Sequence, residues 1–161
     1  MKTDFYTCLE PLSQCLLSKN WLLTTAESCT GGWVAQAVTA LAGSSNWFDR
    51  GFVTYSNAAK QEMLGVAANT IATQGAVSEA TVRAMVQGAL KHSHAQVAIA
   101  ISGIAGPGGG SVDKPVGTVW LAWKTPEQEL AKCFVFAGDR LAVRHQAVTM
   151  ALQQLLELLE S

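Results

Sequence analysis

The stretch TTAESCTGGWVA, residues 24–35, combines a small nucleophile with the start of a helix. Ser28 follows a short β-rich run, and Gly31 and Gly32 stand where the next helix begins. Such a strand-turn-helix junction presents the serine hydroxyl at the carboxyl edge of a sheet, and its glycines let free backbone N–H groups approach an anion or a developing oxyanion. The pattern is typical of a nucleophilic serine, but Ser28 or Thr30 acting only as a helix N-cap explains it equally well.

A serine nucleophile needs a base, and Lys60 is the candidate. The stretch GSSNWFDRGFVTYSNAAK, residues 43–60, places Tyr55 at the end of a strand and Lys60 in the first turns of the next helix, so both can face the same sheet edge as Ser28. An apolar pocket disfavours the charged form of lysine, and lowering its pKa from about 10.4 to about 7 to 8 costs roughly 4 kcal/mol. The alternative is a surface lysine on an amphipathic turn.

Cys29 is a rival nucleophile beside Ser28. The histidines that could serve as its base lie far along the chain, at positions 92, 94 and 145, so we interpret Cys29 as a packing residue. The four cysteines include no CxxC pair and no Cys/His cluster with zinc spacing. This pattern gives no sign of a metal site, and we expect no cofactor either.

A glycine-rich loop leaves the most apolar strand-like run. In ISGIAGPGGGSVDKPVGT, residues 101–118, five of the eight positions from Gly103 to Gly110 are glycine. Glycines let backbone amides cradle a phosphate or a planar ring, and Gly103 and Gly106 are candidates for this role. The loop lacks both the G-x-G-x-x-G and the Gly-Lys-Ser/Thr nucleotide fingerprints, and a connecting loop with no binding role is the alternative.

Arg140 and Arg144 stand four residues apart at the start of the last predicted helix, on one face. Cations at a helix N-terminus oppose the helix dipole unless an anion lies between them or a carboxylate such as Asp139 offsets them. The pair therefore indicates phosphate binding, with a solvated helix face as the alternative.

These residues need a sheet to position them, and alternating strand-like and helix-like runs predict one α/β domain over residues 1–161. We expect three α/β/α layers around a mixed sheet with a C-terminal antiparallel hairpin. The predicted helices cover about residues 4–19, 32–41, 57–64, 79–91 and 140–159. The predicted strands cover about residues 21–26, 52–55, 97–102, 115–123 and 130–136. VAIAIS, residues 97–102, is expected at the centre because its apolar run implies burial on both faces.

Composition excludes several classes of protein. Only 14% of the 161 residues are charged, against about 25% in typical domains, and the net charge of −1 disfavours a nucleic-acid-binding surface. With 49% hydrophobic residues, some apolar surface should be hidden in a subunit contact, so we expect a homodimer or larger homo-oligomer. The start MKTDFYTCLE lacks a signal-peptide pattern, and polar residues interrupt the uncharged stretch 29–48. We expect a cytoplasmic protein with no membrane segment.

Taken together, these stretches resemble the CinA C-terminal domain family over about residues 8–156. The motifs that carry the resemblance are AESCTGGW, SSNWFDRGFVTYSNAAK, GAVSE, ISGIAGPGGG with KPVGTVW, and GDR followed by VR. Stand-alone members of this family are nicotinamide mononucleotide (NMN) deamidases. The resemblance implies a three-layer α/β fold and hydrolysis of NMN to nicotinate mononucleotide and ammonia in pyridine nucleotide (NAD) recycling, with no metal.

The resemblance also implies catalytic roles. Matched by motif, the nucleophile is Ser28 and the base is Lys60. Ser45 is expected to relay a proton or position a group through its hydroxyl, and Tyr55 is expected to contact the substrate.

The resemblance leaves Arg140 and Arg144 both open as the ligand of the substrate phosphate, and we favour Arg140 in the GDR motif. The remaining residues expected at the substrate are Glu27, Thr30, Gly31, Gly32, Gly103 and Gly106, with the glycines supplying backbone donors. Two other functions stay open: a non-catalytic nucleotide-binding, competence-associated module, and a hydrolase of a different small amide.

Overall fold

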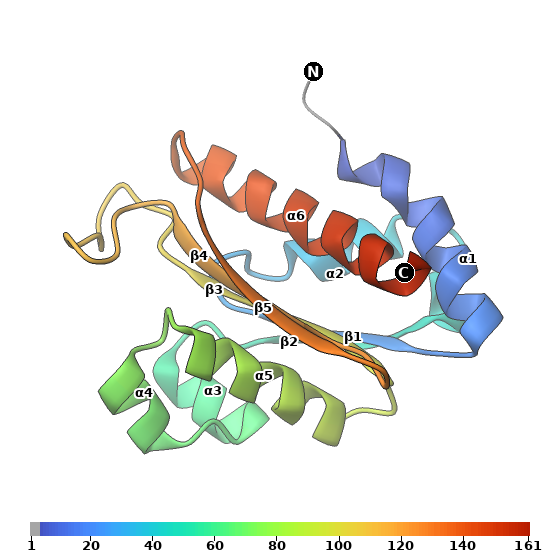
Figure 1. Ribbon diagram of the computed structural model, residues 1–161, viewed down its shortest axis with the longest axis horizontal. Helices are drawn as coiled ribbons and strands as arrows, with labels where there is room; N and C mark the ends of the chain where they lie inside the picture. The colour runs from blue at the N-terminus through green and yellow to red at the C-terminus, as the bar shows by residue number, and fades with distance from the viewer. Residues whose placement is uncertain (1–3) are drawn as a thin grey trace.

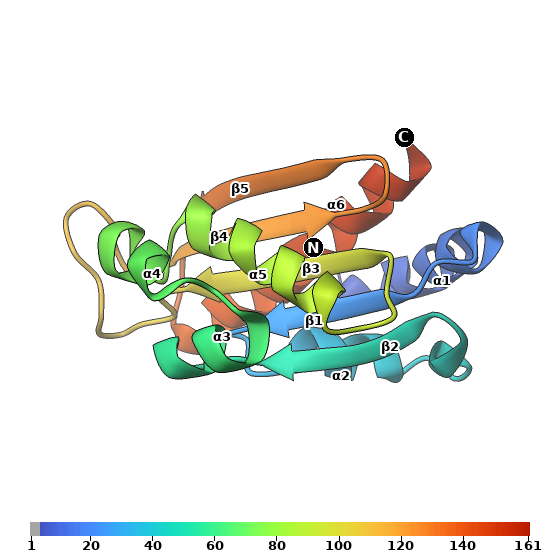
Figure 2. The same cartoon turned by 90° about the horizontal axis from the view of Figure 1, so that it is seen from below.

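The computed structural model describes residues 4–161. They form a five-stranded sheet in the order β2-β1-β3-β4-β5. The strands are β1 (Leu23–Glu27), β2 (Phe48–Val53), β3 (Val97–Gly103), β4 (Thr118–Lys124) and β5 (Glu129–Val135). The strands β2, β1 and β3 run parallel, whereas β4 and β5 pair antiparallel (Figure 2). The predictions of a mixed sheet, a central VAIAIS strand and a C-terminal hairpin are confirmed.

Helices cover both faces of the sheet (Figure 1). One face carries α1 (Leu9–Lys19), α2 (Trp33–Thr39) and α6 (Arg140–Glu160), and the other carries α3 (Asn57–Leu64), α4 (Ala68–Gln74) and α5 (Glu79–Lys91). Two short 3-10 helices, η1 (Phe5–Cys8) and η2 (Ser44–Asn46), precede α1 and β2. The predicted α/β/α fold class is confirmed. No helix within residues 4–161 is long and apolar enough to cross a membrane.

The central strand β3 divides the core by the size of its side chains. Successive side chains of a strand point to opposite faces of the sheet. Val97, Ile99 and Ile101 join the core under α1, α2 and α6, whereas Ala98 and Ala100 join the core under α5. Small side chains on the second face let α5, and α3 packed against it, lie close to the sheet.

Three helices begin at residues whose side chains cap the helix N-terminus, as the sequence predicted. The side chains of Ser56, Ser78 and Asp139 each accept a backbone hydrogen bond from the first turn of α3, α5 and α6. Such caps satisfy N–H groups that the helix itself leaves without partners. The cap at Ser56 matters most, because it fixes where Lys60 stands on α3.

Two elements differ from their predictions. The strand β2 covers Phe48–Val53 instead of about residues 52–55. It is an edge strand with no fully buried residue, and the run Asp49, Arg50 and Gly51 interrupts the apolar pattern that would have revealed its start. The helix α4 was not predicted, since none of its residues is buried and it has no apolar stripe to reveal it.

The parallel strands bring three chain segments to one edge. The carboxyl ends of β1, β2 and β3 lie on the same side of the molecule (Figure 2), and the register pairs Glu27 with Val53 and with Ile101. Ser28, the residues after Val53, and the glycine-rich loop after β3 therefore meet there. Open α/β sheets bind ligands at this kind of edge.

Candidate active site

Ser28 and Lys60 meet at the carboxyl edge of the sheet. Lys60 Nζ lies 3.0 Å from Ser28 Oγ, and it donates to the carbonyl oxygens of Thr54 at 3.0 Å and Tyr55 at 3.2 Å. Only 1% of the Lys60 surface and 7% of the Ser28 surface are exposed. The alternative of a surface lysine is therefore wrong, and the geometry is that of a serine hydroxyl beside a buried amine.

Burial lowers the pKa of Lys60 below the usual lysine value of 10.5, because the interior disfavours the ammonium form. No carboxylate within residues 4–161 forms an ion pair with it. A neutral amine keeps two hydrogens and one lone pair. In the structure, Lys60 Nζ donates to Ser28 Oγ as well as to the Thr54 and Tyr55 carbonyls, and the Ser28 hydroxyl donates to the Tyr55 carbonyl at 3.3 Å. To accept the serine proton, the neutral amine keeps its hydrogens on the two carbonyls and the Ser28 hydroxyl turns from Tyr55 to Nζ.

The turn that carries the candidate nucleophile Ser28, residues 28–32 (the nucleophile turn), is held at both ends. Ser28 N donates to the Ile101 carbonyl of β3 at 3.0 Å, and Gly31 N donates to the Ser28 carbonyl at 3.0 Å. Gly31 and Gly32 have φ angles of +59° and +98°, a region that favours glycine. These two glycines therefore let the chain reverse from β1 into α2 directly after Ser28.

The turn leaves some backbone amides without an acceptor. The Gly31 N–H is taken by the Ser28 carbonyl, which argues against its predicted role as a backbone donor, whereas the Gly32 N–H, also predicted as a donor, donates no hydrogen bond within residues 4–161. In the part of the chain that the structure describes, the N–H groups of Cys29 and Thr30 donate no hydrogen bond. They directly follow Ser28, which is where an oxyanion formed by serine attack needs donors.

Glu27 is a buried support of the turn. Its carboxylate accepts hydrogen bonds from Thr30 Oγ1 at 2.7 Å, Val34 N at 2.8 Å and Ala35 N at 3.1 Å. Glu27 is 1% exposed and Thr30 is fully buried. Both residues were expected at the substrate. The Glu27 carboxylate is taken up by Thr30 and the first turn of α2, and Thr30, whose hydroxyl binds Glu27, keeps its backbone N–H for a ligand.

Cys29 lies at the site with an unreactive thiol. Burial raises the pKa of the Cys29 thiol to about 11. A thiol with this pKa is protonated near neutral pH and is a poor nucleophile. The structure favours the interpretation of Cys29 as a packing residue.

A cavity of about 190 Å³ opens beside Ser28 and Lys60. Its wall includes Gly103, as expected for the glycine-rich segment, and two polar residues that the sequence analysis missed, Asn57 and Ser102. Asn57 stands three residues before Lys60 on α3, so helical spacing could have revealed it. Ser102 could have been found as the polar residue that ends the apolar β3 run.

The two arginines differ in what they face. Arg140 lines the cavity, and it donates to the Gly106 carbonyl at 2.9 Å and to the Tyr55 hydroxyl oxygen at 3.1 Å. Arg144 donates instead to the backbone carbonyls of the nucleophile turn, and it lines the neighbouring hollow but not this cavity. Gly106 thus supports Arg140, and Tyr55, which is 60% exposed, forms the rim beside it.

Ser45 lies away from this site. It belongs to η2, which precedes β2, and the adjacent Trp47 carbonyl accepts a hydrogen bond from Leu23 N at the start of β1. Ser28 follows the far end of β1, and a strand rises about 3.3 Å per residue. The predicted proton relay from Lys60 through Ser45 is therefore wrong within one chain, because the length of β1 separates the two hydroxyls.

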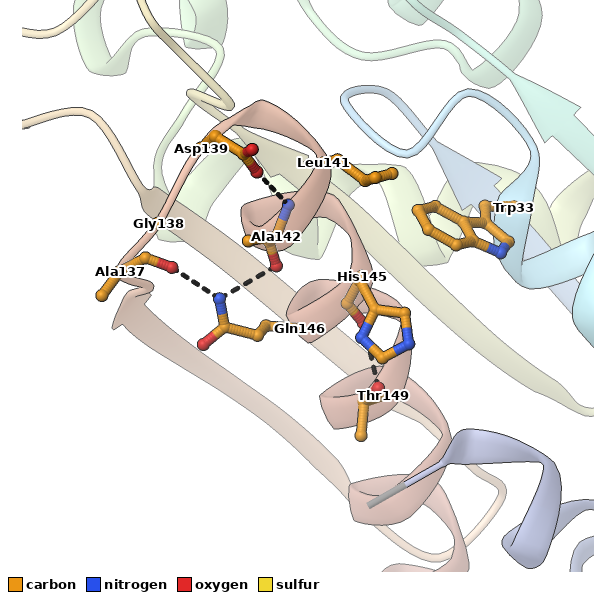
Figure 3. Close-up of a pocket in the computed structure, with 9 residues that line it drawn as sticks. All are labelled: Trp33, Ala137, Gly138, Asp139, Leu141, Ala142, His145, Gln146 and Thr149. Atoms are coloured by element: carbon orange, nitrogen blue, oxygen red, sulfur yellow. Dashed lines mark hydrogen bonds between the residues drawn. The ribbon is translucent and has the colours of Figure 1, made fainter. Parts of the chain in front are cut away.

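Two other hollows adjoin α6. One of about 630 Å³ shares Ala105 and Arg140 with the dyad cavity, so a ligand at Ser28 has room to extend past Arg140. A larger hollow of about 960 Å³ lies on the outer side of α6 and is lined in part by Trp33, Leu141 and His145 (Figure 3). It contains neither Ser28 nor Lys60. Among the described residues, no group of three His, Cys, Asp or Glu side chains is placed to hold a metal ion.

Comparison with known proteins places this geometry in a family. The model of the CinA C-terminal domain matches residues 6–159. The nicotinamide-nucleotide amidohydrolase PncC of Escherichia coli K12 is 56% identical over 147 residues, 91% of this chain and 89% of that protein. The protein of the same name from Pseudomonas putida is 54% identical over 139 residues, covering 86% and 87% of the two chains.

Solved structures agree with these matches. The competence/damage inducible protein CihA from Agrobacterium tumefaciens superposes with a TM-score of 0.94 at 43% identity, covering 100% of this chain and 98% of that one. Fold, motifs and sequence identity lead to one assignment. The chain belongs to the CinA C-terminal domain family.

Proposed function

We propose that this chain hydrolyses the carboxamide of NMN to give nicotinate mononucleotide and ammonia. The observation that carries the proposal is the 3.0 Å contact between Lys60 Nζ and Ser28 Oγ beside a cavity. The substrate is supported by the amidohydrolases of the same family that are 54–56% identical over most of the chain.

In the first half of the reaction, neutral Lys60 takes the proton of the Ser28 hydroxyl while Oγ attacks the carboxamide carbon. The N–H groups of Cys29 and Thr30 stabilise the oxyanion that forms. The Lys60 ammonium then gives its proton to the departing amide nitrogen, and the C–N bond breaks. Ammonia leaves, and the nicotinoyl group stays on Ser28 as an ester.

In the second half, water occupies the place that ammonia left. Lys60, neutral again, takes a proton from this water as its oxygen attacks the ester carbon. The bond to Ser28 Oγ breaks and the serine regains its proton from Lys60. One base serves both halves, which is consistent with a cavity where Lys60 is the amine in contact with Ser28.

Arg140 is the proposed ligand of the substrate phosphate. Its guanidinium lies at the junction of the dyad cavity and the neighbouring hollow, where a ribose phosphate attached to the nicotinamide ring would emerge. A guanidinium presents donors in a fixed fork that suits phosphate oxygens. Tyr55, hydrogen-bonded to Arg140, is the proposed contact for the ribosyl part.

The test is a coupled ammonia assay across NMN, nicotinamide riboside, nicotinamide and NAD. We expect NMN to be the preferred substrate, and both S28A and K60A to lose ammonia release while still binding NMN in a calorimetric titration. Binding of NMN without turnover by the unaltered chain would favour the non-catalytic nucleotide-binding module. Turnover of another amide in preference to NMN would favour a different hydrolase.

The predicted homo-oligomer also stays a proposal. Val135 and Leu141 are 64% and 63% exposed, and such large apolar side chains favour a subunit contact. Light scattering after size exclusion tests this, and a monomer at micromolar concentration would contradict it.

A further inference from the structure

We propose that Arg144 is a positioning residue for the nucleophile turn, and that it acts through backbone carbonyls and not on the substrate phosphate. The inference rests on the proposed function for its kinetic consequences. Its geometric basis is independent of which amide is cleaved.

The contacts of Arg144 converge on the residues that follow Ser28. Its Nε donates to the Cys29 carbonyl at 3.0 Å and its Nη2 to the Thr30 carbonyl at 3.2 Å. Its guanidinium carbon lies 5.4 Å from the ring centroid of Trp33, the first residue of α2. One half-buried side chain on α6 thus holds successive carbonyls of a turn that lies far away in the sequence.

Holding these carbonyls fixes the amides on the other side of each peptide unit. The C=O and N–H groups of a trans peptide lie in one plane and point in opposite directions. The bond to the Cys29 carbonyl therefore fixes the direction of the Thr30 N–H, a proposed oxyanion donor. The bond to the Thr30 carbonyl fixes the Gly31 N–H, which closes the turn onto the Ser28 carbonyl.

The chemistry of the contact requires arginine. The guanidinium is planar, and Nε and Nη2 project side by side, so a single side chain bridges two carbonyl oxygens with a fixed spacing. Lysine carries the same charge on one flexible nitrogen and cannot impose that spacing. The aromatic face of Trp33 also suits a flat cation. Part of the indole lines the hollow on the outer side of α6 (Figure 3).

Glu27 supports the same turn from the opposite side. Its carboxylate binds Thr30 Oγ1 and the first amides of α2. A buried anion and a half-buried cation therefore hold the segment between β1 and α2 through different atoms. Within residues 28–32, this arrangement leaves the N–H groups of Cys29, Thr30 and Gly32 without partners, and the first two directly follow Ser28.

The two arginines should then give different kinetic signatures. Arg140 lines the dyad cavity and is placed to contact substrate. Arg144 lines only the neighbouring hollow, and its Nε and Nη2 are taken up by the carbonyls of the turn. Loss of a phosphate ligand weakens NMN relative to nicotinamide riboside. Loss of a positioning residue lowers turnover of both by the same factor.

The experiment compares R144K with R140K as its matched control, using the purified 161-residue chain. For R144K we expect kcat to fall about 10²-fold with both NMN and nicotinamide riboside, as a displaced reacting group or oxyanion donor does. We expect its KM values and its preference for NMN over the riboside to stay close to those of the unaltered chain. R140K should instead raise KM for NMN and reduce that preference.

A second measurement does not depend on NMN hydrolysis. An uncharged fluorophosphonate modifies an activated serine: Ser28 Oγ bonds to phosphorus, fluoride leaves, and Lys60 takes the hydroxyl proton. R144K should slow this labelling of Ser28, and guanidinium ion added to R144A should restore part of the rate. If the unaltered chain labels at Ser28 but releases no ammonia from NMN, the proposed function fails while this inference stands.

The control for folding is the thermal unfolding midpoint of each variant. Should R144K unfold, W33L removes the aromatic face beneath Arg144 while keeping the arginine, and a smaller decrease in the labelling rate is expected. Labelling of Ser28 at the unaltered rate in a folded R144K or W33L, or an R144K defect confined to phosphorylated substrate, would overturn the inference.

Discussion

Lys60 Nζ lies 3.0 Å from Ser28 Oγ while its other contacts are the carbonyl oxygens of Thr54 and Tyr55. Backbone carbonyls accept hydrogen bonds without carrying a full negative charge, so they orient the amine but compensate little for the loss of its hydration. This combination explains how a lysine can serve as a base. The contact of the amine with Ser28 and the lowering of its pKa come from the same buried position.

The first prediction concerns pH. Burial lowers the pKa of Lys60 below 10.5, and only the neutral amine accepts the Ser28 proton. We expect kcat/KM for NMN to be lost as pH falls through the pKa of Lys60 in the folded enzyme and to reach a plateau above it. Steady-state ammonia release across a pH series measures this midpoint.

The matched variant for this prediction is K60R. Arginine keeps a cation at the site but does not lose its proton in proteins, so we expect K60R to be inactive at every pH. An active K60R enzyme, or an unchanged pH midpoint in K60A, would exclude Lys60 as the titrating base.

The second prediction concerns substrate selection by Arg140. Removing a charge-assisted hydrogen bond to phosphate costs about 1.5–3 kcal/mol, so R140A should lower kcat/KM for NMN about 10-fold to 100-fold. The decrease with nicotinamide riboside should be much smaller. Y55F is the matched control: it removes the hydroxyl that Arg140 binds and keeps the guanidinium. Equal losses on both substrates in R140A would contradict phosphate binding.

The third prediction concerns Glu27. Removing its carboxylate leaves one hydroxyl and two amides at the start of α2 without an acceptor, so E27A should lose about 2–4 kcal/mol of unfolding free energy. Chemical denaturation measures the loss. The exposed Glu62 is the control, because E62A should change stability by less than about 0.5 kcal/mol. Equal stabilities of the two variants would show that the buried carboxylate does not hold the turn.

The fourth prediction concerns the packing that places α3. A Cβ built on Gly88 of α5 would collide with the backbone carbonyl of Leu64 at the end of α3. G88A should therefore cost about 1–3 kcal/mol and lower activity, because Lys60 lies on α3. A Cβ on Gly108 meets nothing within 4 Å, so G108A is the control. An equally stable and active G88A enzyme would mean that α3 does not need this close approach.

The dyad could be predicted because it depends on strand order and local signals alone. Ser28 follows one parallel strand, Lys60 stands on the helix after another, and parallel strands end at the same edge. The cap at Ser56 fixes the start of α3 and so places Lys60 in its first turn, from which its amine contacts Ser28. The antiparallel hairpin and the central strand could also be predicted, because their apolar patterns are strong.

Other parts of the site could not be predicted from the sequence, because they depend on contacts between distant side chains. Glu27 was expected at the substrate, but only the fold reveals that its oxygens are used by Thr30 and α2. Spacing alone left Arg140 and Arg144 equivalent, since both stand on one helical face. What separates them is the dyad cavity that only Arg140 lines and the turn that only Arg144 binds, and both are built by residues far away in the sequence.

Ser45 marks the limit of assigning roles by motif alone. It lies in the same motif as Tyr55 and Lys60, but β2 runs between them and carries the chain from one edge of the sheet to the other. Ser45 is therefore close to Tyr55 in the sequence but is separated from it in space by the length of β2. The missed start of β2 hid this separation.

The central claim is that Ser28 forms an acyl intermediate activated by Lys60, and capturing that intermediate tests it most directly. NMN turnover quenched in acid and followed by peptide mass spectrometry should yield the Ser28 peptide carrying the nicotinate mononucleotide acyl group. K60A quenched in the same way should yield none. Full ammonia release by S28A, or an acyl group found on another residue, would contradict the account.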